Sequence, residues 1–266
     1  MIVHTSLRAI RAAGFAAVLL ASPSAFAIEE TTRTLAEGQQ TVESMEALGA
    51  DLKAVLRPDI GFPEENVAPW QAAVDAAFAR ELLEADFLAA LEERLTDEGR
   101  DAALEFNEST LGEEVRVLVE ESQGVELDDE LRAETEAFLE SVSDEHEALF
   151  TDLFDAQTSV RRSDLAMDLY FRAMKIAAEP VIGAEAADAW IDGAQDMRDI
   201  YTHNYFLTSV ATYRPLSEEK LREFVEAIGS PGMFAFSEQS TAALGVALEA
   251  ASDRLQDAYT EELDNR

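Results

Sequence analysis

The stretch PGMFAFSEQSTAALGVALEAASDRLQDAY, from Pro231 to Tyr259, decides the fold class. Its apolar residues recur at spacings that alternate between four and three: Leu244, Leu248, Ala251, Leu255 and Ala258. This spacing resembles the seam of a coiled coil and places one apolar stripe along an α-helix. We therefore expect a helix that begins at Pro231 and runs close to the C-terminus, with its stripe in the core.

The rest of the sequence also has helical periodicity. Pro and Gly separate the helical patterns, and the alternation typical of strands is nearly absent. We expect one helix in each of these segments, with one or two in the second: Thr31 to Leu56, Gln71 to Leu95 in a region that starts at Pro69, the acidic segment Leu127 to Phe154, Met167 to Pro180, and Trp190 to Tyr205. The predicted class is all-α.

Two segments match each other at an offset of 121 residues. The first copy has Leu95-Thr96-Asp97-Glu98 followed by Phe106, Ser109 and Gly112; the second has Leu216-Ser217-Glu218-Glu219 followed by Ser230, Pro231 and Gly232. Thr96 and Ser217 are suited to cap a helix that starts with two acids, and Ser109 and Ser230 to cap the next helix. The pattern predicts a sharp helix–helix corner in each copy and two related helical halves in a bundle-like array.

Both copies resemble the DUF2059 family, a domain of unknown function found in exported bacterial helical proteins. The family pattern is a Thr/Ser-Glu-Glu helix start followed by Phe-Tyr-x-Ser-Pro-x-Gly. The chain departs from it at Arg100, Thr110 and Ala227, and Gly232 comes one residue early. The resemblance covers about 69–123 and 165–248. It implies an exported helical protein and no particular activity.

These patterns divide the chain into five segments. They are a signal peptide (1–27), an N-terminal helix and loop (28–65), a first helical repeat (66–125), an acidic connecting helix (126–160), and a second repeat with the long C-terminal helix (161–266).

The first segment has the three parts of an export signal. Arg8 and Arg11 precede a short apolar run, and Ala25-Phe26-Ala27 forms an A-x-A cleavage site, which predicts Ile28 as the mature start in the periplasm or outside the cell. Removing the two arginines changes the formal charge from −35 to −37.

The composition argues against several classes of function. Acids outnumber bases 55 to 20, without the basic surface that binds nucleic acid or anionic lipid. No segment after residue 27 is apolar for long enough to span a bilayer. The absence of Cys excludes disulfides, thiolate metal sites and cysteine nucleophiles.

The two histidines beyond residue 27 offer little for catalysis. His146, among acids, is expected to be partly buried and hydrogen bonded, with a pH-responsive role as the alternative. His203 continues a row formed by Asp192, Asp196 and Asp199 at helical spacing. That row predicts either a solvated face or a divalent-cation site. We predict no catalytic, cofactor or metal site.

Aromatic residues concentrate in the second half: Tyr170, Phe171, Trp190, Tyr201, Tyr205, Phe206 and Tyr213. Most are expected in the core, and the alternative is a groove for an apolar ligand or peptide.

The function that fits best is a non-enzymatic envelope accessory factor acting through a protein partner. The alternatives are a binding protein for a small apolar ligand or a divalent cation, and a hydrolase whose site is assembled only in the fold.

Overall fold

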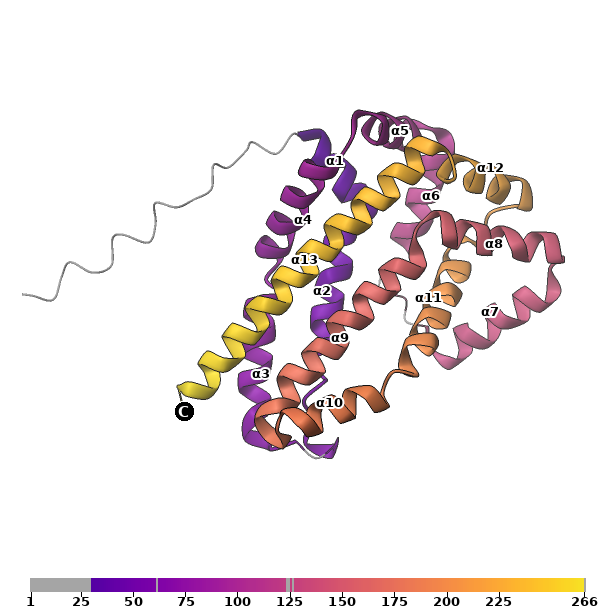
Figure 1. Cartoon of the computed structure of the whole chain (residues 1–266). Coiled ribbons are helices and arrows are strands. Elements are labelled where there is room, and N and C mark those ends of the chain that lie inside the picture. Colours follow the sequence, from indigo (N-terminus) through magenta and orange to yellow (C-terminus); the bar gives the residue numbers. More distant parts are fainter. Residues whose placement is uncertain (1–29, 61, 123–124, 126, 266) are drawn as a thin grey trace, which may run out of the picture.

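The structure, a computed structural model, describes residues 30–60, 62–122, 125 and 127–265. The predicted signal peptide and Ile28 lie outside them. Within the described residues there are thirteen α-helices, one short 3-10 helix at Pro58–Ile60 and no strand, so the predicted all-α class is confirmed. The α-helices (Figure 1) have these bounds: α1 Glu30–Gln39, α2 Thr41–Leu52, α3 Glu64–Ala77, α4 Arg80–Arg94, α5 Asp97–Glu108, α6 Thr110–Glu121, α7 Asp129–Ser141, α8 Asp144–Ala156, α9 Ser159–Ile182, α10 Ala184–Gly193, α11 Met197–Tyr213, α12 Glu218–Ile228 and α13 Pro231–Asp264.

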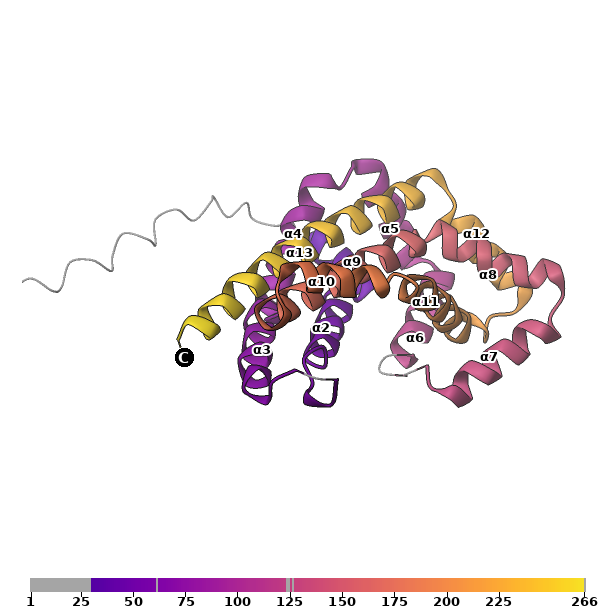
Figure 2. The same ribbon diagram turned by 60° about the horizontal axis from the view of Figure 1, so that its bottom comes forward.

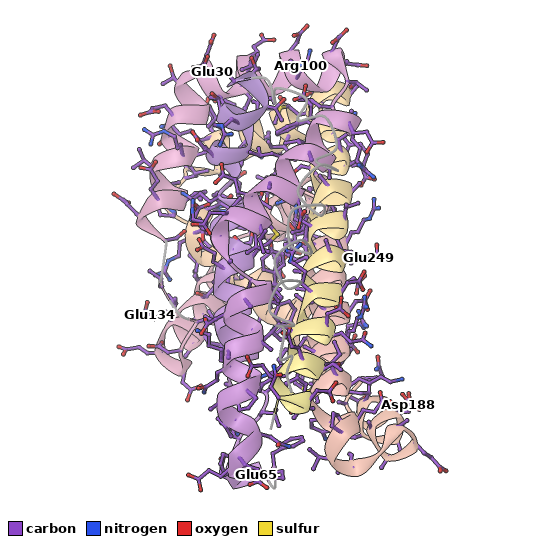
Figure 3. The ribbon with its side chains drawn as sticks, turned by 90° about the vertical axis from the view of Figure 1, so that its left-hand side faces the viewer. Glu30, Glu65, Arg100, Glu134, Asp188 and Glu249 are labelled. Carbon is purple, nitrogen blue, oxygen red and sulfur yellow. The ribbon has the colours of Figure 1, made fainter. Side chains whose placement is uncertain are left out.

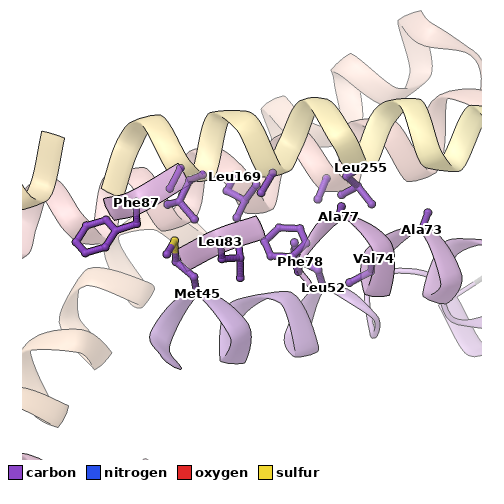
Figure 4. Close-up of a cluster of buried hydrophobic side chains, with 14 of the residues drawn as sticks. Met45, Leu52, Ala73, Val74, Ala77, Phe78, Leu83, Phe87, Leu169 and Leu255 are labelled. Carbon is purple, nitrogen blue, oxygen red and sulfur yellow. The ribbon is translucent and has the colours of Figure 1, made fainter. Parts of the chain in front are cut away.

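Helix α13 is the central element of the bundle, as its apolar stripe predicts. It packs on α3, α4, α5 and α9, and crosses the molecule from one end to the other (Figure 1). Its stripe residues Leu248, Ala251 and Leu255 are buried beside Ala77 and Leu83 of the neighbouring helices (Figure 4). At about 25 cal/mol per Å² of apolar surface, this burial is the main stabilising contribution.

The buried apolar residues form two clusters that do not follow the two predicted halves. The first joins α2, α3 and α4 to α9 and most of α13. The second joins α5, α6, α8, α11 and α12 to Met233 and Phe236 at the start of α13. The predicted boundaries 65/66 and 160/161 lie within α3 and α9. Because helices from both ends of the chain share each cluster, the bundle folds as an interleaved array.

The two predicted corners are present, at α5–α6 and α12–α13, and they pack on each other. Phe106 of α5 stacks on Phe224 of α12 with ring centroids 5.7 Å apart. Lys220 of α12 pairs with Glu114 of α6. Each of α5 and α12 thus contacts the other corner.

Three of the four predicted caps are confirmed. Thr96, Ser109 and Ser217 each accept a hydrogen bond from the backbone N–H three residues later, at 3.2, 2.9 and 3.3 Å. The prediction for Ser230 is wrong in its chemistry: it occupies the N-cap position, but its hydroxyl donates to the carbonyl oxygen of Ala227 at 2.7 Å. Pro231 follows at the first position of α13, where its missing N–H needs no partner.

Three predicted single helices are pairs in the structure. The segment 31–56 divides at Gln40, whose φ of 52° turns the chain so that α1 and α2 both reach α4. The segment 127–154 divides after Ser141, because Ser143 accepts the backbone N–H of His146 and starts α8. The segment 190–205 divides between α10 and α11.

Two predicted helix ends at prolines are also wrong. Pro69 lies inside α3, which begins at Glu64, and Pro180 lies inside α9, which continues to Ile182. A proline inside a helix removes one backbone hydrogen bond. Both helices are held by buried faces, so packing outweighs that loss.

Carboxylates project outward around the bundle, as Figure 3 shows for Glu30, Glu65, Glu134 and Glu249. No helix of the described residues combines the length and the apolar content that a membrane span needs.

The glycines of the two corners are required by close packing, which gives a stability prediction. A methyl group at Gly112 would overlap the carbonyl oxygen of Phe106, and one at Gly232 would lie 2.6 Å from Cβ of Ala102. Gly112→Ala and Gly232→Ala should each lower the free energy of unfolding by roughly 1–3 kcal/mol, measured by urea denaturation.

The matched control is Gly193→Ala, because a methyl group there meets no atom within 4 Å. This change should be neutral or stabilising by up to about 1 kcal/mol, through the higher helix propensity of Ala. Equal effects at all three positions would contradict the packing explanation.

Candidate functional site

A continuous groove runs between α2 and α11, with α9 as its floor. Helix α9 packs on both α2 and α11, whereas α2 and α11 are not themselves a closely packed pair in the described part of the chain (Figure 2). Three cavities of about 290, 120 and 330 Å³ follow one another along this line, and a fourth of about 220 Å³ adjoins the third between α11 and the helices α6 and α7. Neighbouring cavities share lining residues, for example Tyr201, Tyr205 and Thr212.

The groove has a length set by α11. Its lining on that helix begins at Met197 and reaches Thr212, which corresponds to about 22 Å at 1.5 Å per residue.

Four of the five tyrosines in the chain line this groove: Tyr170, Tyr201, Tyr205 and Tyr213. The rings of Tyr201 and Tyr205 stack with centroids 6.5 Å apart. The hydroxyl of Tyr213 accepts a hydrogen bond from Nε2 of Gln157 at 3.3 Å. Four of the seven aromatic residues thus line a groove, which was the alternative to the expected position in the core.

The other three aromatic residues of that prediction belong to the core. Phe171 is buried, with the guanidinium of Arg198 5.4 Å from its ring centroid. Trp190 packs on Phe62, and Phe206 on Phe154, with ring centroids 5.8 and 5.4 Å apart.

The chemistry of the groove changes along its length. We call the 290 Å³ cavity the apolar compartment; it is lined chiefly by Leu48, Met167, Tyr170, Met197, Ile200 and Tyr201. We call the adjoining 120 Å³ cavity the arginine compartment; it contains Arg162 together with Thr41, Ser163 and Tyr205. The 330 Å³ cavity beyond it is lined mainly by hydroxyl and amide side chains. The 220 Å³ cavity is lined by leucines and hydroxyl side chains together with the charged residues Glu121 and Arg214.

The mouth of the apolar compartment gathers exposed apolar residues. Ile200, Met197 and Tyr201, all on α11, are 61%, 41% and 36% exposed. The other exposed large hydrophobic residues of the described chain are spread over several elements, and one of them, Val125, lines the 220 Å³ cavity: Leu82, Val117, Val125, Val160, Ile182, Phe234 and Val246. At the groove mouth, three apolar side chains of one helix remain in water.

The hydroxyls of Tyr170, Tyr201 and Tyr213 are neutral hydrogen-bonding groups at physiological pH, because their pKa values are raised. Burial raises the pKa of Tyr201 to about 12, with smaller contributions from Tyr205 and Asp51. Burial also raises the pKa of Tyr213 and of Tyr170, and Arg57 partly offsets the shift at Tyr170.

The acidic row is divided between α10 and α11. Asp192 ends up on α10, Asp196 precedes α11, and Asp199 and His203 are exposed on α11. In the described residues, no three His, Cys, Asp or Glu side chains are placed to hold one metal ion. The break between α10 and α11 interrupts the single helix that the row requires.

His146 is partly buried, as expected, but its hydrogen bonding differs from the prediction. The imidazole stacks on Phe150 with centroids 5.5 Å apart and meets the ring of Phe138 edge-on. Its buried Nε2 has no hydrogen-bond partner in the described part of the chain. The side chain thus acts as an aromatic surface beside the second cluster.

Arg162 and Thr41 were not identified from the sequence as site residues. Arg162 differs from its neighbour Arg161 only in its place on α9, and a threonine at the start of α2 looks like an ordinary helix-end residue. Their importance depends on what lies opposite them in the groove.

No family model, curated protein or solved structure matches this chain. The DUF2059 resemblance and the internal repeat therefore stay predictions.

The raised pKa of Tyr201 gives a pH prediction. An unfolded tyrosine ionises near pH 10, whereas Tyr201 in the fold keeps its proton to about pH 12. The folded state thus binds more protons in this window, so the free energy of unfolding should fall as pH rises from about 10 to 12. Tyr201→Phe should reduce this fall.

Ultraviolet titration of tyrosinate, with circular dichroism to monitor folding, checks the assignment. The number of late-ionising tyrosines should fall by one in Tyr201→Phe, whereas Tyr170 and Tyr213, whose pKa values are also raised, should still ionise late. A titration curve that loses only an early-ionising tyrosine in Tyr201→Phe would contradict it.

Proposed function

We propose that this protein is a non-enzymatic binding protein for a small, largely apolar molecule, which it holds in the groove between α2 and α11. One observation carries the proposal: the apolar compartment, the tyrosines and the exposed apolar residues of α11 all meet at one place. Binding sites for small molecules are typically concave and apolar, with a few placed polar groups. The compartment of about 290 Å³ lies at the lower end of their usual size, and the connected cavities extend it.

The groove chemistry favours binding over catalysis. The apolar compartment offers Asp51, Asn204 and tyrosine hydroxyls as its polar groups. In the arginine compartment, the hydroxyl of Ser163 is engaged with the carbonyl of Val160 and with Thr202, at 2.8 and 2.9 Å. A serine nucleophile needs a general base within hydrogen-bond reach, and these partners are a carbonyl and a hydroxyl.

Of the two binding alternatives, the apolar ligand has more support than the divalent cation. The acidic row is split between two helices, whereas the aromatic residues converge on a cavity. Three exposed apolar residues of α11 that a protein partner could use, Met197, Ile200 and Tyr201, lie at the same groove mouth. A small apolar ligand would cover them without a partner protein.

The proposal predicts that the neutral fluorescent probe N-phenyl-1-naphthylamine binds in the groove. Its fluorescence should rise on mixing and saturate at one probe per chain. Ile200→Glu places a charge at the mouth and should weaken binding by about tenfold or more, because burying an unpaired charge beside an apolar ligand is costly.

Val246→Glu is the matched control. Val246 is exposed to 38% on α13 and lines none of the groove cavities, so this change adds the same charge elsewhere. The Val246→Glu variant should bind the probe with the same affinity as the unmodified protein. No saturable binding, or equal weakening by both changes, would reject the groove as the site.

We also propose that the protein acts outside the cytoplasm, on the strength of Arg8, Arg11 and the Ala25-Phe26-Ala27 site. N-terminal sequencing of the exported protein should give Ile28 or a residue within a few positions of it. Full-length protein retained inside the cell would contradict this prediction.

A further inference from the structure

Almost every described cation of this acidic chain has a carboxylate partner. Of the seventeen Lys and Arg residues in the described part, fifteen lie within 4.0 Å of an Asp or Glu oxygen. The two exceptions are Arg132 and Arg162, which bond only to neutral groups. With 55 acids for 20 bases, a half-buried arginine without an acid is unexpected on charge grounds.

The guanidinium of Arg162 is held in a fixed orientation by side chains of α13. Its Nε donates to the hydroxyl of Thr241 at 3.0 Å, and one terminal nitrogen donates to Ser240 at 3.3 Å. Thr241 is also 2.6 Å from the hydroxyl of Thr158, which donates to the carbonyl of Gln157 at 2.7 Å. Because each hydroxyl has one proton, the Thr241 proton points to Thr158 and its oxygen is left to accept from Arg162.

These hydrogen bonds use Nε and one terminal nitrogen of Arg162, so the other terminal nitrogen can donate to a ligand in the groove. The terminal nitrogen Nη1 of Arg162 has no hydrogen bond within the described residues, and the side chain lines the arginine compartment. A guanidinium held by neutral partners keeps its full charge for an external acceptor. Carboxylates are the acceptors that its planar fork fits best.

A second group that lines the same compartment also lacks a hydrogen-bond partner. Thr41 of α2 is 3% exposed and lines the same compartment as Arg162. Its hydroxyl oxygen is buried and has no hydrogen-bond partner in the described part of the structure. An unsatisfied buried hydroxyl costs about 1–3 kcal/mol, so a ligand oxygen that bonds to it would gain from its burial.

We infer that the ligand is a small organic carboxylate, with its acid group between Arg162 and Thr41 and its apolar body in the apolar compartment. This inference rests on the proposed function, because it names the charge of the molecule that the groove would bind. The two compartments share Leu48, Ala166 and Tyr201, so one ligand reaches from one into the other.

The negative charge of the whole chain disfavours a carboxylate ligand. The charge of the whole chain and the local site therefore predict opposite orders of affinity, which an experiment can distinguish. A formal charge of −35 attracts cations, and Asp51 lines the far side of the apolar compartment. Long-range attraction therefore predicts that a cationic ligand binds best. Local recognition by Arg162 and Thr41 predicts the opposite order.

Three probes with one apolar body separate these expectations: decanoate, 1-decanol and decylammonium. Their affinities are measured by calorimetry and by displacement of N-phenyl-1-naphthylamine at neutral pH and physiological ionic strength. Decanoate should bind about tenfold more tightly than decanol, the gain expected from a charged hydrogen bond, and decylammonium should bind most weakly.

The variants compare adjacent arginines. Arg162→Gln should bring decanoate to the affinity of decanol and leave decanol unchanged. Arg161→Gln is the matched control: Arg161 is exposed and paired with Glu238 at 3.0 Å, so its loss should leave the decanoate preference intact. Arg162→Lys keeps the charge without the fork and should retain part of the preference, which covers the case that Arg162→Gln fails to fold.

The Thr41→Val variant separates a role of Thr41 in binding from a role in stability, because the two roles predict different effects on the melting temperature and on decanoate affinity. The change removes an unsatisfied hydroxyl at nearly constant shape, so the melting temperature of the free protein should stay the same or rise. Decanoate affinity should nevertheless fall several-fold, with decanol unaffected.

The outcomes separate the inference from the proposed function. If N-phenyl-1-naphthylamine fails to bind, the proposed function fails and the inference with it. If the neutral probe binds but decanol or decylammonium equals or exceeds decanoate, the carboxylate assignment alone is overturned. The same holds if Arg161→Gln and Arg162→Gln change decanoate affinity equally.

Discussion

Helix α13 has an apolar face along nearly its whole length, and the other helices of the bundle pack so that this face is buried. Helix α13 places Met233 and Phe236 in one apolar cluster and Leu248, Ala251 and Leu255 in the other. Helices from the first third of the chain cover one part of it, and α9 covers another. Both clusters contain residues of α13. This helix therefore fixes where the two clusters lie relative to each other.

The groove is a consequence of the same packing. Helix α9 lies beside α13, and α2 and α11 both pack on α9 without forming a closely packed pair of their own. The left-handed residues Gln40 and Thr158, with φ of 52° and 55°, set the starts of α2 and α9. Residues in this conformation are uncommon outside glycine and frequently occur near functional sites. Here they lead into two of the three helices that enclose the groove.

Charge pairing follows one rule in the described part of the molecule, with two exceptions. The carboxylates project outward into solvent, and the described lysines and arginines other than Arg132 and Arg162 pair with them at the surface, where each pair contributes little to stability. Arg162 instead donates hydrogen bonds to the hydroxyls of Thr241 and Ser240. These contacts fix its direction without neutralising it. A preorganised charge beside an apolar cavity is the arrangement by which binding sites gain specificity.

The sequence by itself determined the helical class, the course of α13 and the two corners, because each depends on local rules. A stripe at spacings of three and four predicts a buried helix face, and Thr96, Ser109 and Ser217 predict caps from their own neighbours. It also indicated that aromatic residues of the second half could line a groove, without distinguishing Tyr201 from Phe171. Helix breaks at Gln40 and Ser143 were missed, because packing on other helices selects among turns that the local sequence allows.

Only the tertiary structure decided which residues form the site. Tyr170, Tyr201, Tyr205 and Tyr213 meet on one groove, whereas Phe171, Trp190 and Phe206 turn into the core. Arg161 and Arg162 are the same residue type at adjacent positions, yet Arg161 pairs with Glu238 and Arg162 lines the same compartment as Thr41. The physical reason is that burial and partner choice depend on the rotation of each helix against its neighbours. Contacts between residues that are distant in the sequence set that rotation.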